Sequence, residues 1–183
     1  MKLLKFIGQL VNKSSITILF ISIVFLVYVL LMKYIDHSTR SIIILIPVLA
    51  LCKVIFFTFF TFRKMQALMN RLAGMSEVLL IFALLVVLMS FSFATDFSCL
   101  AEFDRQSFKG ISDNTNMSSW KRLFDYFYLS VVTFTSLGYG DIVPLSIPAK
   151  LLVMMEVGLS FLLGIFGLSN IKLIQHKISN TIQ

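Results

Sequence analysis

The chain has 183 residues, of which 58% are hydrophobic and 14% are charged, and its mean hydropathy is +0.92. A soluble domain carries about 25% charged residues and could not bury this much apolar surface, so the composition excludes a soluble domain and indicates a membrane protein. The net charge of +7 comes from short basic segments beside apolar runs, a pattern of membrane topology and not of a nucleic-acid-binding surface.

The first elements are a basic segment and an apolar run. Residues 1–15 contain Lys2, Lys5 and Lys13 and no acidic residue, and we expect them to form a cytoplasmic N-terminus. Ile16 to Met32 then provides seventeen uncharged residues, enough to span a bilayer with its flanks. This run is too long for the core of a signal peptide, and no small-residue cleavage site ends it.

The second apolar run extends from Ser41 to Phe62 and completes a predicted two-helix hairpin over residues 16–72. Pro47 lacks a backbone donor and should kink this helix. Lys53 lies near the middle of the bilayer, where an ionisable side chain is costly and marks either a functional site or a paired group. The next basic residues are too distant for a voltage-sensor array, so we expect Lys53 to have a structural partner or a role in gating.

A third span is predicted at residues 77–95, and a polar external loop at 96–119 follows it. Residues 120–135 form an amphipathic helix that Ser118 or Ser119 can cap. This helix is too short and too polar at its start to cross a membrane. We expect it to enter and stop part way, an arrangement that is stable only where protein surrounds it.

The last span is predicted at residues 147–171, with a cytoplasmic tail at 173–183. Most basic residues fall in the predicted cytoplasmic segments, which places both termini of a four-span chain inside the cell. The acidic residues that we assign to external loops are Asp36, Asp96, Glu102, Asp104 and Asp113.

A short glycine-containing segment separates the amphipathic helix from the last span. Gly138 and Gly140 can adopt positive φ, so their alternation with larger residues lets successive carbonyl groups turn to the same side. Four copies around an axis would then present rings of oxygens that replace the water of a dehydrated cation, and the Ser136 hydroxyl could add one ring. The segment reads Thr135-Ser136-Leu137-Gly138-Tyr139-Gly140-Asp141.

This segment resembles the selectivity filter of potassium channels, whose usual form is T-V-G-Y-G-D. The G-Y-G-D part matches, whereas Ser136 stands where Thr is usual and Leu137 where Val or Ile is usual. With its flanking helices, the region 76–172 is similar to the two-helix pore module of prokaryotic potassium channels, here preceded by two extra helices. The resemblance implies K+ coordination within the filter, residues 136–141, by Ser136, Leu137, Gly138, Tyr139 and Gly140.

The resemblance also assigns supporting residues. In the family, the acid after the filter often bonds an aromatic residue of the pore helix, which implies a bond between Asp141 and Tyr128. The carboxylic acid that some members keep behind the filter is replaced here by Val132. We expect Glu156 of the last span to be protonated or to bond the pore helix from behind, and a pair with Lys53, which lies at similar depth, is a third alternative.

Several residues of the last span are candidates for gating. Ser160 aligns with the family's hinge glycine, and Gly158 and Gly164 could let the helix bend or could pack against a neighbouring helix. We expect Gly167 to be a packing site. Thr135 should support the filter by bonding a carbonyl one turn back.

The sequence therefore predicts an all-α membrane protein with four transmembrane helices, a re-entrant pore helix and a filter, assembled as a homotetramer in the bacterial plasma membrane. The predicted function is passive, selective K+ conduction, without a cofactor or nucleic acid; membrane lipid and an unknown regulatory subunit are the other expected partners. Two alternatives stay open: a weakly selective monovalent cation channel, and a non-conducting scaffold or sensor with a pore-like fold. An enzyme is not expected, because no catalytic or metal-ligand cluster lies at membrane depth.

Overall fold

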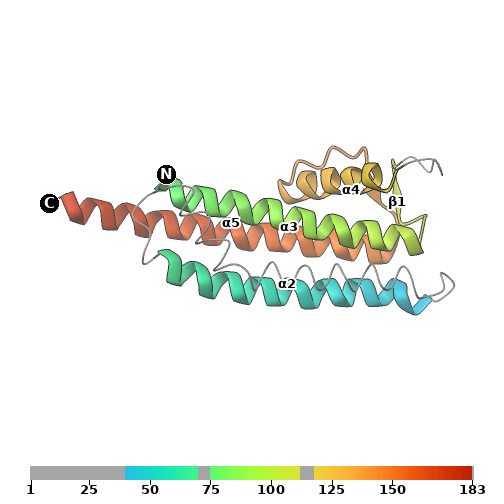
Figure 1. Ribbon diagram of the computed structural model, residues 1–183, viewed down its shortest axis with the longest axis horizontal. Helices are drawn as coiled ribbons and strands as arrows, with labels where there is room; N and C mark the ends of the chain where they lie inside the picture. The colour runs from blue at the N-terminus through green and yellow to red at the C-terminus, as the bar shows by residue number, and fades with distance from the viewer. Residues whose placement is uncertain (1–39, 70–74, 112–117, 183) are drawn as a thin grey trace. The chain divides into compact units, whose positions relative to one another are not determined.

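The computed structural model describes residues 40–69, 75–111 and 118–182 (Figure 1). The chain divides into two units, residues 1–39 and 40–183, and every described element belongs to the second unit. The predicted N-terminal segment and first span therefore lie outside the described residues. The elements are helices α2 (Arg40–Met69), α3 (Met75–Phe103), α4 (Ser119–Phe134) and α5 (Ile147–Ile182), and strands β1 (Phe108–Lys109) and β2 (Val143–Pro144).

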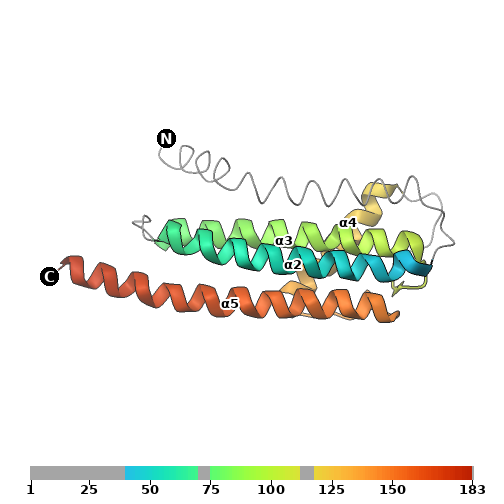
Figure 2. The ribbon, with the colours of Figure 1, turned by 90° about the horizontal axis from the view of Figure 1, so that it is seen from below.

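Three long helices lie side by side and run alternately in opposite directions, as the colours of Figures 1 and 2 show. Helix α3 contacts both α2 and α5, and α2 also contacts α5. The shorter helix α4 packs on α3 and α5 beside the end of α3 that leads into β1. The short helix is thus supported from behind by two long ones.

Two described helices contain stretches that are long and apolar enough to cross a membrane, Phe82–Phe103 in α3 and Ile147–Ile165 in α5. Helix α2 contains a shorter apolar stretch, Ile43–Phe59. The described part of the chain is thus an all-helical membrane fold apart from two very short strands.

Helix α3 is longer than the sequence predicts, because it continues through Phe103 and not only to residue 95. Phe93, Phe97 and Leu100 keep the spacing of one helical face, and all three are buried, so the helix gains apolar contacts by continuing. The assignment of Asp96 to the external loop is therefore wrong: Asp96 lies within α3 and is fully buried.

Helix α5 also exceeds its predicted end and extends to Ile182, through most of the expected tail. Its start follows from local chemistry. The Ser146 hydroxyl accepts a hydrogen bond from the Ala149 N–H at 3.3 Å, which is the geometry of an N-cap. Pro148 stands in the first turn, where its missing N–H has no helical partner to lose.

Candidate functional site

Helix α4 corresponds to the predicted pore helix, shifted by one residue. Ser118 occupies the N-cap position, where its carbonyl accepts the N–H groups of Lys121 and Arg122, although its side chain makes no capping hydrogen bond. The helix is strongly two-faced, and its buried side chains recur at the spacing of one helical face. They are Tyr126, Leu129, Ser130, Val132, Thr133 and Phe134.

The C-terminus of α4 closes in a Schellman motif. Thr135 is the C-cap residue, and Ser136 follows with a φ of 58°. The Ser136 N–H donates to the Thr133 carbonyl and the Leu137 N–H to the Val132 carbonyl, each at 3.0 Å. These two bonds define the motif, whose left-handed position is usually occupied by glycine. The chain leaves the helix abruptly at Ser136.

The filter segment has an alternating backbone. Ser136, Gly138 and Gly140 have φ of 58°, 56° and 77°, and Leu137 and Tyr139 between them do not lie in this region. A Cβ added at either glycine would meet nothing within 4 Å on this chain, so glycine is favoured there by the φ angle and not by a lack of space. The alternation is the backbone pattern expected of stacked carbonyls.

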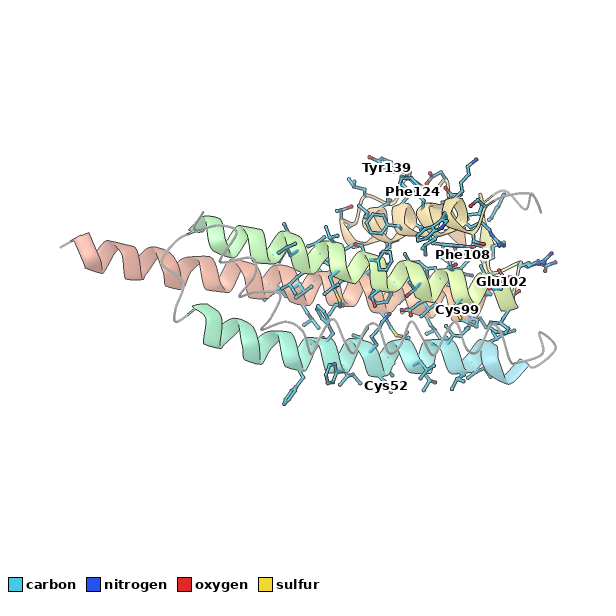
Figure 3. All side chains as sticks on the ribbon, in the orientation of Figure 1. Cys52, Cys99, Glu102, Phe108, Phe124 and Tyr139 are labelled. Atoms are coloured by element: carbon cyan, nitrogen blue, oxygen red, sulfur yellow. The ribbon has the colours of Figure 1, made fainter. Side chains whose placement is uncertain are left out.

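The filter side chains are exposed on this chain. Leu137 is 60% exposed and Tyr139 is 67% exposed, and Figure 3 shows Tyr139 beyond α4 on the side away from the long helices. Phe124 of α4 points the same way and is 67% exposed. One face of the site is therefore open in a single copy of the chain.

The structure brings Asp141 and Tyr128 together, as the resemblance implies. A hydrogen bond with the Tyr128 hydroxyl is the main cause that lowers the pKa of Asp141, and the same bond raises the pKa of Tyr128. The Ile142 N–H further lowers the pKa of the Asp141 carboxyl. This contact ties the residue after the filter to the pore helix.

Thr135 supports the filter from its inner end, because its hydroxyl donates to the Val131 carbonyl one turn back in α4 at 2.7 Å.

A second contact on the outer side was not predicted from the sequence. Strand β1 pairs with β2 in an antiparallel register that places Phe108 opposite Pro144. Next to it, Gly110 has a φ of +99°, and a Cβ there would lie 1.8 Å from the carbonyl oxygen of Asp141. Only glycine permits this close approach, so Gly110 belongs to the support of the filter.

Ser107 extends the same support to the long helices. Its carbonyl accepts the Leu145 N–H at 2.8 Å, and its hydroxyl donates to Asp104 Oδ2 at 2.7 Å. The Ser146 hydroxyl lies 3.2 Å from the Ser107 hydroxyl and donates to it. The end of α3 is thus bonded to the start of α5 on the outer side of the filter.

Glu156 lies behind the pore helix. Its side chain is fully buried, and one of its carboxyl oxygens accepts a hydrogen bond from the hydroxyl of Ser130, which is also fully buried. The structure therefore gives Glu156 the bond to the pore helix that was one of its expected roles, and Lys53 pairs with Asp96 instead. Val132, the position where some family members keep an acid, is buried and apolar.

Lys53 has a different partner from the one considered in the sequence. Its ammonium donates to Asp96 of α3 and, at 3.1 Å, to the Ser92 carbonyl. It also lies 4.9 Å from the centre of the Phe93 ring, at a distance typical of a cation–π contact. The sequence did contain a signal for this pair, because the spacing of Phe93 and Phe97 extends α3 past Asp96.

The candidates in α5 separate into two kinds. The Ser160 hydroxyl donates to a carbonyl of its own helix at 2.8 Å. A Cβ added at Gly158 or Gly164 would meet nothing within 4 Å on this chain, whereas at Gly167 it would lie 3.3 Å from the Phe82 ring. Gly167 is therefore the packing site that the sequence predicts.

Comparison with known proteins agrees with this arrangement. Residues 43–173, most of the chain, match a family described as ion channel. The chain is also similar to the two-pore potassium channel 4 of Arabidopsis thaliana, with 35% identity over 86 residues. That match covers 46% of this chain and 27% of the plant protein, so the chain spans well under half of this relative. No solved structure matches the chain.

Proposed function

The chain belongs to the ion channel family, and on that premise we propose that it conducts K+ passively and selectively through a pore formed by four copies. The family consists of channels and not of enzymes. The observation that carries the choice of ion is the alternating backbone at Ser136, Gly138 and Gly140, on a segment that reads S-L-G-Y-G-D.

The alternation supports K+ selection because it lets consecutive carbonyl oxygens line one path. Such oxygens can replace the hydration shell of a potassium ion. The proposed ligands are the backbone carbonyls of the filter together with the Ser136 hydroxyl, and the bond between Asp141 and Tyr128 would hold the outer end. Non-selective relatives carry Asp after the first glycine of the filter, where this chain has Tyr139. The filter residues are Ser136, Leu137, Gly138, Tyr139 and Gly140.

The proposal of four copies rests on the uneven exposure of the pore helix. Trp120 and Phe124 are 78% and 67% exposed, and they lie on the same helix as fully buried Ser130. Exposed aromatic side chains at adjacent turns mark a surface that contacts either another protein or lipid. Neighbouring copies around the filter would cover this face and surround the re-entrant helix with protein.

The remaining parts of the proposal come from the sequence. We place four spans in the plasma membrane with both termini in the cytoplasm, because basic residues flank the spans on one side. The prokaryotic origin is proposed from the resemblance of residues 76–172 to prokaryotic pore modules. Lipid surrounds the tetramer, and gating acts on α5 at Gly158, Ser160 or Gly164 or through a separate subunit.

The test is ion flux through purified protein in liposomes of defined lipid. We expect K+ flux well above Na+ flux, and block by Ba2+. Gly138→Asp should abolish the flux or make it unselective. Gln106→Asp is the matched control, because it adds the same charge at an exposed position near the outer end and outside the filter; its flux should match that of the wild type.

Two results would contradict the proposal. Equal K+ and Na+ flux in the wild type would indicate a general cation channel. This is the second candidate function because Ser136 and Leu137 depart from the usual filter residues. Absence of flux together with absence of Ba2+ binding to the filter would indicate a non-conducting scaffold or sensor.

A further inference from the structure

The rear face of the pore helix is held at two points. Tyr126 and Ser130 are four residues apart in α4 and so lie on the same face, and they are 4% and 0% exposed. Tyr126 is the end of a series of contacts that begins at Lys53 of α2, and Ser130 is bonded to Glu156, whose carboxyl the Lys53 charge affects. Helix α2 is in this way joined to the element that carries the filter.

The first series is polar. Lys53 is paired with Asp96, and the charges of both residues act on the Glu156 carboxyl. Glu156 in turn accepts the hydroxyl of Ser130. The first series thus consists of two bonded pairs, Lys53 with Asp96 and Ser130 with Glu156, and the charges of the first pair act on the second.

The second series is aromatic and starts at the Phe93 ring that faces the Lys53 ammonium. The ring centres of Phe93 and Phe97 are 6.2 Å apart, and those of Phe97 and Phe108 are 5.5 Å apart. Phe108 then meets Tyr126 edge-on at 5.4 Å. Figure 3 shows Phe108 between α3 and α4. Because Phe108 also pairs with Pro144, this row contacts the pore helix before the filter and strand β2 after it.

Burial makes these contacts restrictive. Lys53 is 2% exposed and Asp96 is 0% exposed, so neither charge can leave the other without becoming an unpaired charge away from water. Helix α2 therefore cannot shift along α3 at this level while the pair is intact. Any movement of α2 has to move α3 with it or break the pair.

We propose that Lys53 is a positioning residue for the selectivity filter. It fixes α2 to the rear of the pore module, and through Glu156 and the aromatic row it sets the position of α4 and hence the geometry of residues 136–141. The effect on ion selection rests on the proposed channel function, whereas the mechanical coupling of α2 to α4 does not.

The coupling is tested by amide hydrogen exchange in residues 126–141 of the full-length protein in detergent or nanodiscs. Lys53→Met should raise the exchange of this segment roughly 2- to 30-fold, the range that corresponds to the coupling energies usual between linked sites. Lys53→Arg keeps the charge and should leave most of the protection. Lys150→Met, the same replacement at an exposed lysine of α5, should leave the exchange unchanged.

Ion selection is tested by a double-mutant cycle between the two ends of the polar series. Lys53→Met and Ser130→Ala should each lower the ratio of K+ to Na+ permeability, and the double variant should lose no more than the larger single effect. A merely structural role for Lys53 would reduce the amount of folded protein and leave this ratio unchanged in the fraction that folds. Additive losses, or an unchanged ratio in Lys53→Met, would overturn the proposal.

Lys53→Met places an unpaired carboxyl in the core, so a variant that retains the pair is also needed. Exchanging the two residues, Lys53→Asp with Asp96→Lys, keeps the opposite charges and should restore protection and selectivity toward the wild type. If the variant with the swapped charges folds but has the same hydrogen-exchange rates and ion selectivity as Lys53→Met, the pair does not position the filter. If Lys53→Met raises hydrogen exchange in residues 126–141 but the wild type shows no ion flux, only the proposed channel function is refuted.

Discussion

The two faces of the pore helix differ in how far their side chains are buried and bonded within one chain. Behind α4, the polar side chains of Ser130 and Glu156 are bonded to each other, and Tyr126 packs edge-on against Phe108. In front, Trp120 and Phe124 have no such cover and are largely exposed. The rear is a buried protein core, whereas the front is exposed on a single chain.

This difference indicates which changes should act mainly on folding and which should act directly on conduction. The rear contacts join α3, α4 and α5 within one chain and should determine whether the chain folds. The front carries the filter residues and needs further copies before an ion can be surrounded by oxygens. Changes at the front should therefore act on assembly and ion selection, whereas changes at the rear should act on the free energy of unfolding and, through the position of α4, on ion selection as well.

The largest effect is expected from the buried ion pair. Lys53→Met should lower the free energy of unfolding by about 3–5 kcal/mol, because it leaves the Asp96 charge buried without its cation. The matched double variant, Lys53→Met with Asp96→Leu, should recover most of this loss, since well-packed apolar residues often replace a buried pair without cost. Denaturant titration in detergent micelles measures both, and equal midpoints for wild type and Lys53→Met would contradict the burial of this pair.

Gly110→Ala should have the next largest effect. The new Cβ would collide with the Asp141 carbonyl, and the φ of +99° disfavours any side chain, so we expect a loss of about 1–3 kcal/mol at the outer end of the filter. Gly164→Ala is the matched control: its added Cβ meets nothing on this chain, and in a helix it should stabilise by roughly 0.5–1 kcal/mol. Thermal melting of both variants provides the comparison, and a stable Gly110→Ala would exclude the close approach.

Ser136, between the end of α4 and the filter, provides a test of how the helix closes. Its left-handed conformation costs a residue with a Cβ about 1–2 kcal/mol. Glycine would avoid this cost but would lose part of the gain, because it is more flexible in the unfolded state. Ser136→Gly should therefore raise the melting temperature slightly, and Ser136→Thr should lower it because a β-branched residue fits this region poorly. The reverse order of the two variants would show that Ser136 does not close α4 in this way.

The smallest effect should come from the bond between Tyr128 and Asp141, which is exposed to water. This bond lowers the pKa of Asp141, so its stabilising contribution is present above the ordinary Asp pKa of about 3.9 and is lost as the pH falls through the lower pKa of the folded protein. Tyr128→Phe should raise the pKa of Asp141, and its stability difference from the wild type should vanish in acid.

Titration of the Asp141 carboxyl by NMR measures this shift directly. Tyr139→Phe removes another nearby hydroxyl without removing the bond, and should leave the pKa of Asp141 where it is in the wild type. An Asp141 pKa that is the same in all three proteins would show that the hydroxyl of Tyr128 does not reach the carboxylate.

Much of the fold near the filter follows from short-range pattern. The alternation of Gly138 and Gly140 predicts their positive φ, and the two-faced run before them predicts α4 to within a residue. These features depend on neighbours in sequence, so a single sequence contains them. The first predicted span and the N-terminal segment lie outside the described residues and remain predictions.

The contacts that the sequence did not reveal are long-range. Asp96 is the first charge after a long apolar run, so it suggested the start of a loop. The helix continues because Phe97 and Leu100 bury their side chains. Nothing near Gly110 indicates that it approaches Asp141 thirty-one positions later. Such partners are set by tertiary packing, which overrides the local preference of one charged residue or one glycine.

The most direct measurement of ion selection is the reversal potential of the reconstituted protein with K+ on one side of a planar bilayer and Na+ on the other. Each tenfold preference for K+ displaces this potential by about 59 mV. We expect a displacement of that size or more for the wild type and for Gln106→Asp, and a potential near zero, or no current, for Gly138→Asp. A wild-type potential near zero would contradict a potassium-selective filter at residues 136–141.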